Sequence, residues 1–386
     1  MSEITSLSFA LDPKSIPSFL LDWEVTKLCN LDCSYCSTGI ELGSHDNSTK
    51  HPPMTECIES IDFMFAYVDL YMKYKKPVHR KVVLNVYGGE SLYHPNIVEI
   101  LNEVHKKYQK FKDNWFLTVT CTTNAIIGVR QWKKIIPLID RFTLSYHTET
   151  NQKQKEIFKR NLLSLKDINK PHSVIIMMNN QQDLWQDSID MISFCKQNDI
   201  NYIAKPLDNT AEKWSYTAEQ FNTLKTFWIN QVPAKQQESY KEFICDVGNT
   251  ESNSINQGRA CCGGRQLSIN SELKSKVTFV PKQNFESWHC SVNWFFLFVQ
   301  QLTGKIYVNK DCRMNFEGGV GPIGNMQNAD LLLQTLEDQL TNKTMPVIEC
   351  AKKICLCGFC APKAKLKEDF QSIIGRYIID NPLKNL

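Results

Sequence analysis

The chain has 386 residues, of which 42% are hydrophobic and 22% are charged, and 44 basic residues against 41 acidic ones leave a net charge of +3. This balance gives no support to a nucleic-acid backbone or an anionic membrane surface as the partner. The sequence has no apolar run long enough to cross a bilayer and no signal peptide at its start. Because 15 cysteines without a secretion signal favour metal ligation over disulfides, we expect a cytoplasmic protein.

From residue 21 to about residue 230, short apolar segments alternate with amphipathic segments of helix length. The predicted strands are 21–27, 81–87, 115–122, 141–146, 172–178 and 200–206. The predicted helices are 54–75, 96–110, 130–138, 152–166, 184–198 and 217–231. Repeated alternation of this kind predicts parallel βα units, in an open sheet or a partial barrel. In either fold, the ligand site lies at the C-terminal ends of the strands.

Three cysteines follow the first predicted strand with C-x3-C-x2-C spacing, namely Cys29, Cys33 and Cys36. Three thiolates so close together can hold three corners of a cubane iron–sulfur cluster. The fourth iron then has no protein ligand and can bind another molecule. Two other interpretations stay open at this point, which are buried cysteines that act as small hydrophobes and a zinc site.

Polar or small residues also follow the other predicted strands. Gly88-Gly89-Glu90 ends the second strand, where two glycines let the backbone pass close to a ligand and a carboxylate can pair with a cationic amine. Later strands end in polar residues that include Asn124, Ser145 and Lys205. Three further cysteines fall inside predicted helices or strands and are expected in the core, namely Cys57, Cys121 and Cys195.

After about residue 240 the alternation stops and cysteines become frequent. Nine of them lie there, namely Cys245, Cys261, Cys262, Cys290, Cys312, Cys350, Cys355, Cys357 and Cys360. Two apolar segments, 294–299 and 305–308, predict a hairpin that would bring its flanking cysteines together. The last four cysteines could instead form a structural zinc site. Three acidic residues of this region could accept a proton from a substrate, namely Asp246, Asp311 and Glu317.

The cysteine loop, with Tyr35 just before its last cysteine, and the Gly-Gly-Glu segment one βα unit later resemble the radical S-adenosylmethionine (SAM) enzymes. This resemblance implies a 4Fe–4S cluster on the three cysteines whose open iron binds SAM, with Gly88, Gly89 and Glu90 at the methionine amino group. It also implies SAM contacts from Tyr35, Asn124, Ser145 and Lys205. Ala125 stands where the family's Thr-Thr-Asn-Gly stretch has glycine.

The implied chemistry is reductive. An electron from a donor such as flavodoxin or ferredoxin cleaves SAM to methionine and a 5′-deoxyadenosyl radical, which removes hydrogen from a substrate. The cysteine-rich third resembles the SPASM and twitch extensions of this family, which hold auxiliary 4Fe–4S clusters. At least one such cluster is expected, with ligands drawn from Cys290, Cys312, Cys350, Cys355, Cys357 and Cys360. A second could use Cys261 or Cys262, and the grouping of thiols stays open.

The expected fold is α/β, a partial (β/α)6 TIM-like barrel followed by a small cysteine-rich C-terminal domain with a β-hairpin. The expected parts are an N-terminal extension 1–20, a radical SAM barrel 21–240, an auxiliary-cluster domain 241–370 and a tail 371–386.

The resemblance favours a peptide or protein side chain as substrate, changed by oxidation, crosslinking or epimerisation. Because only about twenty residues precede the first strand, we expect either a separate leader-peptide recognition protein as a partner or a substrate without a leader. Radical chemistry on a small molecule, such as a sugar or aminocyclitol, is the alternative. A non-catalytic iron–sulfur or zinc-binding interaction module is another. No nucleic-acid or membrane partner is expected.

Overall fold

The computed structural model describes residues 6–7, 19–36, 50–77, 79–207, 216–231, 265–269, 276–281, 287–309, 321–350 and 363–365. Within these residues the largest sheet has nine strands, in the order β14-β13-β12-β2-β3-β4-β5-β6-β7. No helix of the described part is both long and apolar enough to span a membrane.

Six neighbouring strands of this sheet run parallel to one another. They are β2 (Phe19–Thr26), β3 (Lys81–Gly88), β4 (Phe116–Thr123), β5 (Arg141–Tyr146), β6 (His172–Met178) and β7 (Tyr202–Pro206). Each of the six predicted strands is therefore confirmed, and its limits differ from the prediction by at most two residues.

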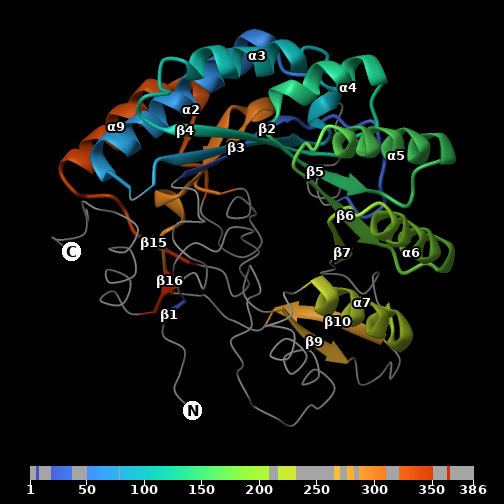
Figure 1. Ribbon diagram of the computed structural model, residues 1–386. Helices are drawn as coiled ribbons and strands as arrows, with labels where there is room; N and C mark the ends of the chain where they lie inside the picture. Colours follow the sequence, from blue (N-terminus) through green and yellow to red (C-terminus); the bar gives the residue numbers. More distant parts are fainter. Residues whose placement is uncertain are drawn as a thin grey trace.

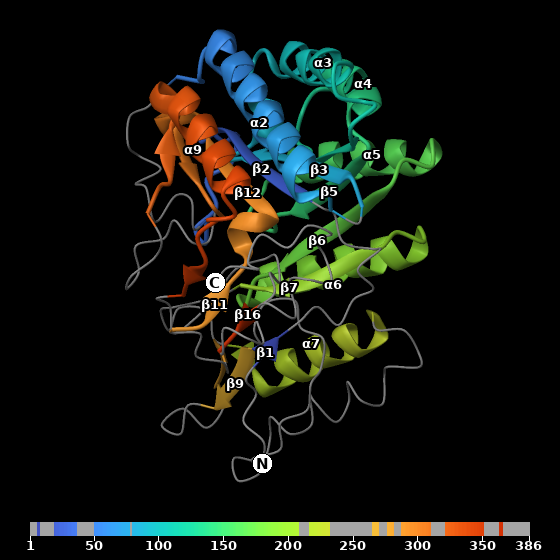
Figure 2. The same cartoon turned by 90° about the vertical axis from the view of Figure 1, so that its left-hand side faces the viewer.

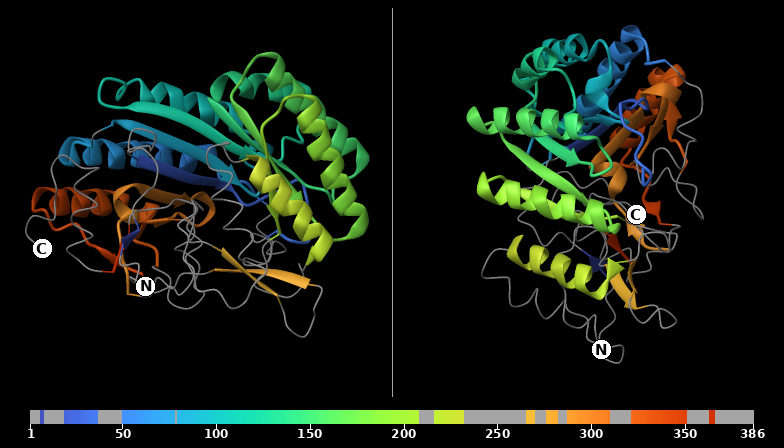
Figure 3. Two further views of the ribbon diagram at one scale, coloured as in Figure 1. Left: turned by 60° about the horizontal axis from the view of Figure 1, so that its bottom comes forward. Right: turned by 90° about the vertical axis from the view of Figure 1, so that its right-hand side faces the viewer.

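Six helices follow the parallel strands in alternation. They are α2 (Met54–Lys75), α3 (Ile97–Tyr108), α4 (Val129–Ile135), α5 (Gln152–Asp167), α6 (Gln182–Gln197) and α7 (Ala218–Gln231). Figure 1 shows the sheet curved into an open arc with the helices along its outer face, and Figure 3 shows them in succession around that arc. This architecture confirms the expected α/β partial barrel.

The core lies between the sheet and the helices because alternate residues of each strand are apolar. On β2, Phe19, Leu21, Trp23 and Val25 are fully buried on the side of the helices. Since side chains along a strand alternate between two faces, the residues between them face the inside of the arc. The same period of two places polar residues of β3 and β4 on this concave face.

The predicted hairpin is present as β12 (Phe296–Gln300) and β13 (Lys305–Tyr307), which pair in antiparallel. Unexpectedly, β12 also pairs in parallel with β2, so the hairpin extends the main sheet beyond its first strand. The helix α9 (Ala329–Thr341) then packs against α2, where the Tyr74 hydroxyl donates to Glu337 Oε1 at 2.8 Å (Figure 2).

Short strands form two smaller sheets. One has the order β1 (Ser6–Leu7), β16 (Lys363–Ala364), β11 (His289–Cys290) and β15 (Ile348–Glu349). The other has the order β8 (Tyr216–Thr217), β10 (Lys276–Pro281) and β9 (Arg265–Ile269). The main sheet ends in β14 (Gly324–Asn325) beside β13.

Candidate functional site

The cysteine loop leaves the C-terminal end of β2, and the backbone that follows β3 holds its first half. Gly89 N–H donates to Thr26 O and Glu90 N–H donates to Leu28 O, both at 2.9 Å. A Cβ on Gly88 would lie 2.1 Å from Thr26 O, and one on Gly89 would lie 2.2 Å from Lys27 O. The two glycines therefore make room for the chain that leads into the cysteine loop. Their role beside SAM stays a prediction.

Glu90 ties the end of β3 to the end of β4. Its side chain is 1% exposed. Oε1 accepts from Leu92 N–H at 2.9 Å and from the Thr123 hydroxyl at 2.8 Å, while Oε2 accepts from Asn124 N–H at 2.6 Å. Burial raises the pKa of this carboxyl to about 6, and its three hydrogen bonds act in the opposite direction. In the described structure, Glu90 therefore connects the end of β3 to the end of β4 through hydrogen bonds.

Asn124 connects the end of β4 to the first half of the cysteine loop. Its Nδ2 donates to Asn30 Oδ1 at 2.7 Å and lies 3.9 Å from Cys29 Sγ. Asn30 in turn donates through Nδ2 to Ile126 O at 2.8 Å. Between them Ala125 has φ of 54°, a left-handed conformation that glycine adopts without strain. Alanine in place of the glycine expected from the resemblance thus makes the backbone conformation of this turn less favourable.

Glu149 holds the second half of the loop, although the sequence did not single it out. Ser34 donates to its carboxylate from N–H at 2.7 Å and from the hydroxyl at 2.6 Å. Asn179 Nδ2, at the end of β6, donates to Glu149 Oε1 at 3.3 Å. The available signal was the position of this acidic residue shortly after a strand end, next to the polar Ser145-Tyr146-His147 stretch.

His147 lies against the same half of the loop. Its Nδ1 is 2.9 Å from the Tyr35 hydroxyl and 3.5 Å from Cys33 Sγ, and its ring stacks on Tyr35 at an interplanar angle of 11°. Burial, with a smaller effect of the positive charge of Lys205, lowers the pKa of His147 to about 4. The structure thus brings Tyr35, His147 and Lys205 into one neighbourhood. Ser145, half-buried on β5, points to the concave face.

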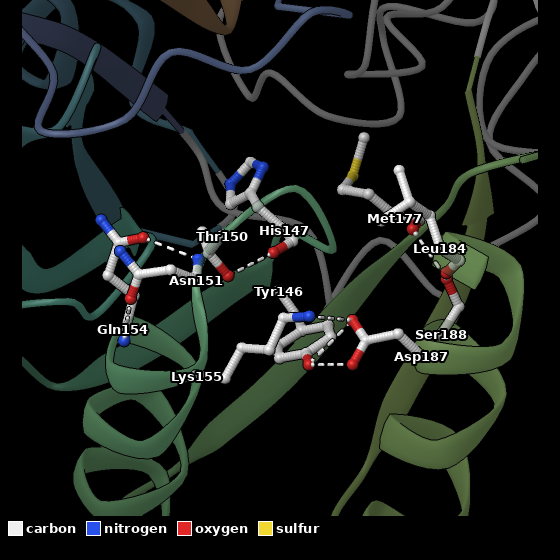
Figure 4. A network of polar contacts seen from close by, with 10 residues as sticks. All are labelled: Tyr146, His147, Thr150, Asn151, Gln154, Lys155, Met177, Leu184, Asp187 and Ser188. Carbon is white, nitrogen blue, oxygen red and sulfur yellow. Dashed lines mark hydrogen bonds and ion pairs between the residues drawn. The ribbon is translucent and has the colours of Figure 1, made fainter.

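A polar network on the outer side of the sheet anchors the strand end that carries His147 and Glu149 (Figure 4). The Tyr146 hydroxyl donates to Asp187 at 3.0 and 3.1 Å, and Lys155 Nζ lies 3.1 Å from the same carboxylate. Figure 4 shows Tyr146 and His147 pointing in opposite directions from neighbouring positions. Because Asp187 belongs to α6 and Lys155 to α5, both helices fix the end of β5 behind the site.

The three thiols of the loop act on one another electrostatically. Burial raises the pKa of Cys33, which is only partly exposed, to about 12, and Cys29 and Cys36 add to the rise. Such thiols become thiolates only when positive charge is supplied, as the irons of a cluster supply it. The donor set of Cys29, Cys33 and Cys36 therefore fits an iron–sulfur cluster.

Tetrahedral zinc needs its ligands gathered around one point. In the described part of the chain, no three His, Cys, Asp or Glu side chains gather in this way. The zinc interpretation of this loop stays open.

Two of the C-terminal cysteines are in described residues, and one sheet brings them together. Cys290 on β11 is opposite Ile348 on β15, and Cys350 N–H donates to Trp288 O at 2.8 Å. This register places Cys290 and Cys350 as diagonal neighbours on the same face. The other candidates of this region lie outside the described residues, namely Cys245, Cys261, Cys262, Cys312, Cys355, Cys357, Cys360, Asp246, Asp311 and Glu317.

The three cysteines expected in the core are confirmed there, because Cys57, Cys121 and Cys195 are each 0% exposed. His172 lies at the start of β6, at the N-terminal ends of the strands, whereas the cysteine loop lies at their C-terminal ends. Its Nδ1 is 2.7 Å from Lys170 O.

Comparison with solved structures finds distant likenesses. One, described as native anSMEcpe with bound AdoMet and Cp18Cys peptide, is 12% identical, with a TM-score of 0.49, and the match covers 93% of this chain and 97% of that one. Another, native anSMEcpe with bound AdoMet, is 12% identical, with a TM-score of 0.48, and the match covers 83% of each chain. Likenesses this distant say nothing about the substrate of this chain.

A comparison with curated proteins gives no match. The profile of the Radical SAM superfamily matches residues 23–192, which run from β2 to α6 and include the cysteine loop, Gly88-Gly89-Glu90, Asn124 and His147. This part of the chain is therefore similar to the radical SAM domain.

Proposed function

We propose that the chain is a radical SAM enzyme in which Cys29, Cys33 and Cys36 hold a 4Fe–4S cluster with one iron open to SAM. The bound cluster would supply the electron that splits SAM into methionine and a 5′-deoxyadenosyl radical, which removes hydrogen from the substrate. One observation carries this proposal: contacts from the ends of β3, β4 and β5 hold the loop with the three thiols.

The residues of the chain itself contribute position and shape. The backbone of Gly89 and Glu90 fixes the entry to the loop, and Asn124 and Glu149 fix its two halves. Glu90 orients Asn124 through its backbone N–H, so its first role is positioning. We also propose SAM contacts from Ser145, on the concave face of β5, and from Lys205, whose positive charge acts on His147.

Production of 5′-deoxyadenosine tests the proposal. Protein reconstituted anaerobically with iron and sulfide, then given dithionite and SAM, should form 5′-deoxyadenosine, and candidate substrates should increase the rate. Cys29→Ala, Cys33→Ala and Cys36→Ala should each form none. Cys57→Ala is the matched control, since its thiol is fully buried in α2, and it should keep the activity. Fully loaded wild-type protein that forms no 5′-deoxyadenosine would contradict the proposal.

We further propose an auxiliary 4Fe–4S cluster that includes Cys290 and Cys350, and a peptide or protein side chain as substrate. The diagonal placement of Cys290 on β11 and Cys350 directly after β15 supports the cluster. An oxidation leaves an electron on the substrate, which such a cluster can accept. The cysteine spacing, through its resemblance to SPASM extensions, supports the peptide substrate.

An iron count tests the auxiliary cluster. Cys290→Ala should lose about four irons per chain, one 4Fe–4S cluster, and keep the cluster of the Cys29 loop. Cys195→Ala, another buried cysteine, should lose none. Equal iron in Cys290→Ala and wild type would exclude Cys290 as a ligand.

A small polar molecule is the second candidate substrate, and the concave face favours it. There Asn85 Nδ2 donates to Asp22 Oδ1 at 2.8 Å, and the Thr120 hydroxyl donates to Asn85 Oδ1 at 3.3 Å. Such groups suit a hydroxylated ligand. Parallel assays with short peptides and with aminocyclitols would separate the two, because the true substrate should increase 5′-deoxyadenosine formation. A flavodoxin or ferredoxin in the cytoplasm is the proposed electron donor.

A further inference from the structure

A single imidazole nitrogen lies against two side chains of the cysteine loop. His147 Nδ1, from the end of β5, is 2.9 Å from the Tyr35 hydroxyl and 3.5 Å from Cys33 Sγ. The two rings are stacked, with centroids 5.9 Å apart and planes at 11°. Tyr35 and Cys33 are two residues apart on the loop. The contact therefore joins a thiol of the cluster loop, an adjacent phenol and an imidazole from another strand.

The protonation of His147 follows from its surroundings. Its Nδ1 faces two groups of the cysteine loop, the Cys33 thiol and the Tyr35 hydroxyl. A cysteine that ligates iron is a thiolate, which can only accept hydrogen bonds. An imidazole lone pair directed at this thiolate would be repelled, so we assign the proton to Nδ1. The imidazole N–H and the Tyr35 O–H are then the two donors beside Cys33.

We propose that His147 is a positioning residue that raises the reduction potential of the cluster, by donating to Cys33 directly and by orienting the Tyr35 hydroxyl. The inference rests on the proposed function, since it requires a cluster on this loop. One electron, from a ferredoxin, a flavodoxin or dithionite, enters the oxidised cluster and increases the negative charge on its sulfurs. Hydrogen bonds to those sulfurs stabilise the reduced form, which makes reduction easier.

The anchoring of β5 supports this role. Tyr146, next to His147, is fixed to Asp187 at 3.0 and 3.1 Å, and Thr150 donates to His147 O at 2.7 Å. Figure 4 shows these contacts on both sides of His147. The backbone at His147 is therefore fixed by a contact with helix α6 and by a hydrogen bond within the turn that follows β5. A donor held in this way loses little freedom when it bonds to the thiolate.

The test is the midpoint potential of the cluster, measured by redox titration followed by electron paramagnetic resonance. His147→Leu should lower the ratio of reduced to oxidised cluster at a fixed potential by about tenfold, since a hydrogen bond to a charged group is lost. For a one-electron couple this equals a shift of about 59 mV to lower potential. His147→Asn keeps an N–H near the position of Nδ1 and should stay close to wild type. Tyr35→Phe should shift the potential in the same direction by a smaller amount.

His172→Leu is the matched control, because it makes the same change in the same sheet but at the N-terminal ends of the strands. The potential of the cluster in this variant should equal that of wild type. His147→Leu with wild-type iron content and wild-type potential overturns the inference while the proposed function stands. If His147→Leu holds no iron, an unchanged potential in Tyr35→Phe overturns it instead. Wild-type protein that binds no cluster overturns both.

Discussion

The two halves of the cysteine loop are held in different ways. Backbone hydrogen bonds to Gly89 and Glu90 fix the chain that leads to Cys29, and the two glycines leave no space for a Cβ. Side chains from the end of β5, Glu149 and His147, hold the part with Cys33, Ser34 and Tyr35. The difference suggests a division of roles, in which the first half is a fixed frame and the second half can be adjusted by substitution.

The physical reason lies in what each contact can tolerate. A backbone contact at van der Waals distance has no flexible part that can move aside, so a larger residue must displace a strand end. A carboxylate or an imidazole at the end of a side chain can be replaced by a shorter or neutral group, with loss of a hydrogen bond only. The predictions below test this contrast.

The largest effect is expected at Gly89. Gly89→Ala places a Cβ about 2.2 Å from Lys27 O and 2.6 Å from Leu28 O, both of them backbone atoms. We expect a loss of roughly 3–5 kcal/mol in the free energy of unfolding, together with loss of iron binding. Urea unfolding of the iron-free protein and an iron assay measure the two effects.

Gly128→Ala is the control for Gly89→Ala, because nothing lies within 4 Å of its added Cβ. It should cost less than about 1 kcal/mol, mostly as a poorer N-cap of α4. A Gly89→Ala variant as stable as Gly128→Ala would show that the first half of the loop is not a fixed frame.

The next effect concerns pH and Glu90. Its pKa is about 6 in the folded protein against 4.5 as the reference value, so the folded state binds the proton more readily between these limits. Stability from this group is therefore present below pH 4.5 and is lost as the pH rises through 6. The loss is roughly 2 kcal/mol. Urea unfolding at several pH values should show that the free energy of unfolding falls with rising pH in wild type and changes less in Glu90→Gln.

If the free energy of unfolding changes equally with pH in the two proteins between pH 4.5 and 6, the ionisation of Glu90 does not destabilise the folded state. The fixed half of the loop would then depend on backbone contacts alone.

A smaller effect is expected at Glu149, in the adjustable half. Glu149→Gln removes the charge that accepts two hydrogen bonds from Ser34, at 2.7 and 2.6 Å, but keeps one acceptor oxygen. Because Ser34 is exposed, the cost should be only about 1 kcal/mol. The variant should still bind the cluster, and a slower gain of iron during reconstitution should be measurable.

Glu156→Gln is the control, since it removes an exposed carboxylate of α5 that accepts from Gln152 Nε2 at 3.3 Å, one turn away on the same helix. Its stability should lie within about 0.5 kcal/mol of wild type. A complete loss of iron in Glu149→Gln would show that the second half of the loop tolerates substitution no better than the first.

The smallest effect is expected at Ala125. Ala125→Gly relieves the left-handed conformation at φ of 54°, but it removes a buried methyl group and makes the unfolded chain more flexible. These effects oppose one another, so the free energy of unfolding should change by less than about 1 kcal/mol. Thermal unfolding measures it, and a larger change would show that this turn contributes to the frame.

The sequence predicted the strands and helices well, because apolar residues at periods of two and 3.6 follow directly from a core between sheet and helices. It also placed Gly88-Gly89-Glu90 and Asn124 at the strand ends. The backbone of Thr26, Lys27 and Leu28 lies directly against these two glycines, and their contact with SAM stays a prediction.

Other parts of the site could not be predicted locally. The contacts of Glu149 and His147 with the loop join residues more than a hundred positions apart, and they depend on how neighbouring strands are aligned. The parallel pairing of β12 with β2 joins even more distant segments, which the pattern within either segment does not specify.

The most direct measurement of the central claim is the electron paramagnetic resonance spectrum of the reduced protein with and without SAM. If Cys29, Cys33 and Cys36 hold a cluster with an open iron, the signal of a reduced 4Fe–4S cluster should change when SAM is added. That change should be absent when all three cysteines are replaced by alanine. A wild-type spectrum that SAM leaves unaltered, or a SAM-dependent change that survives the triple replacement, would contradict the claim.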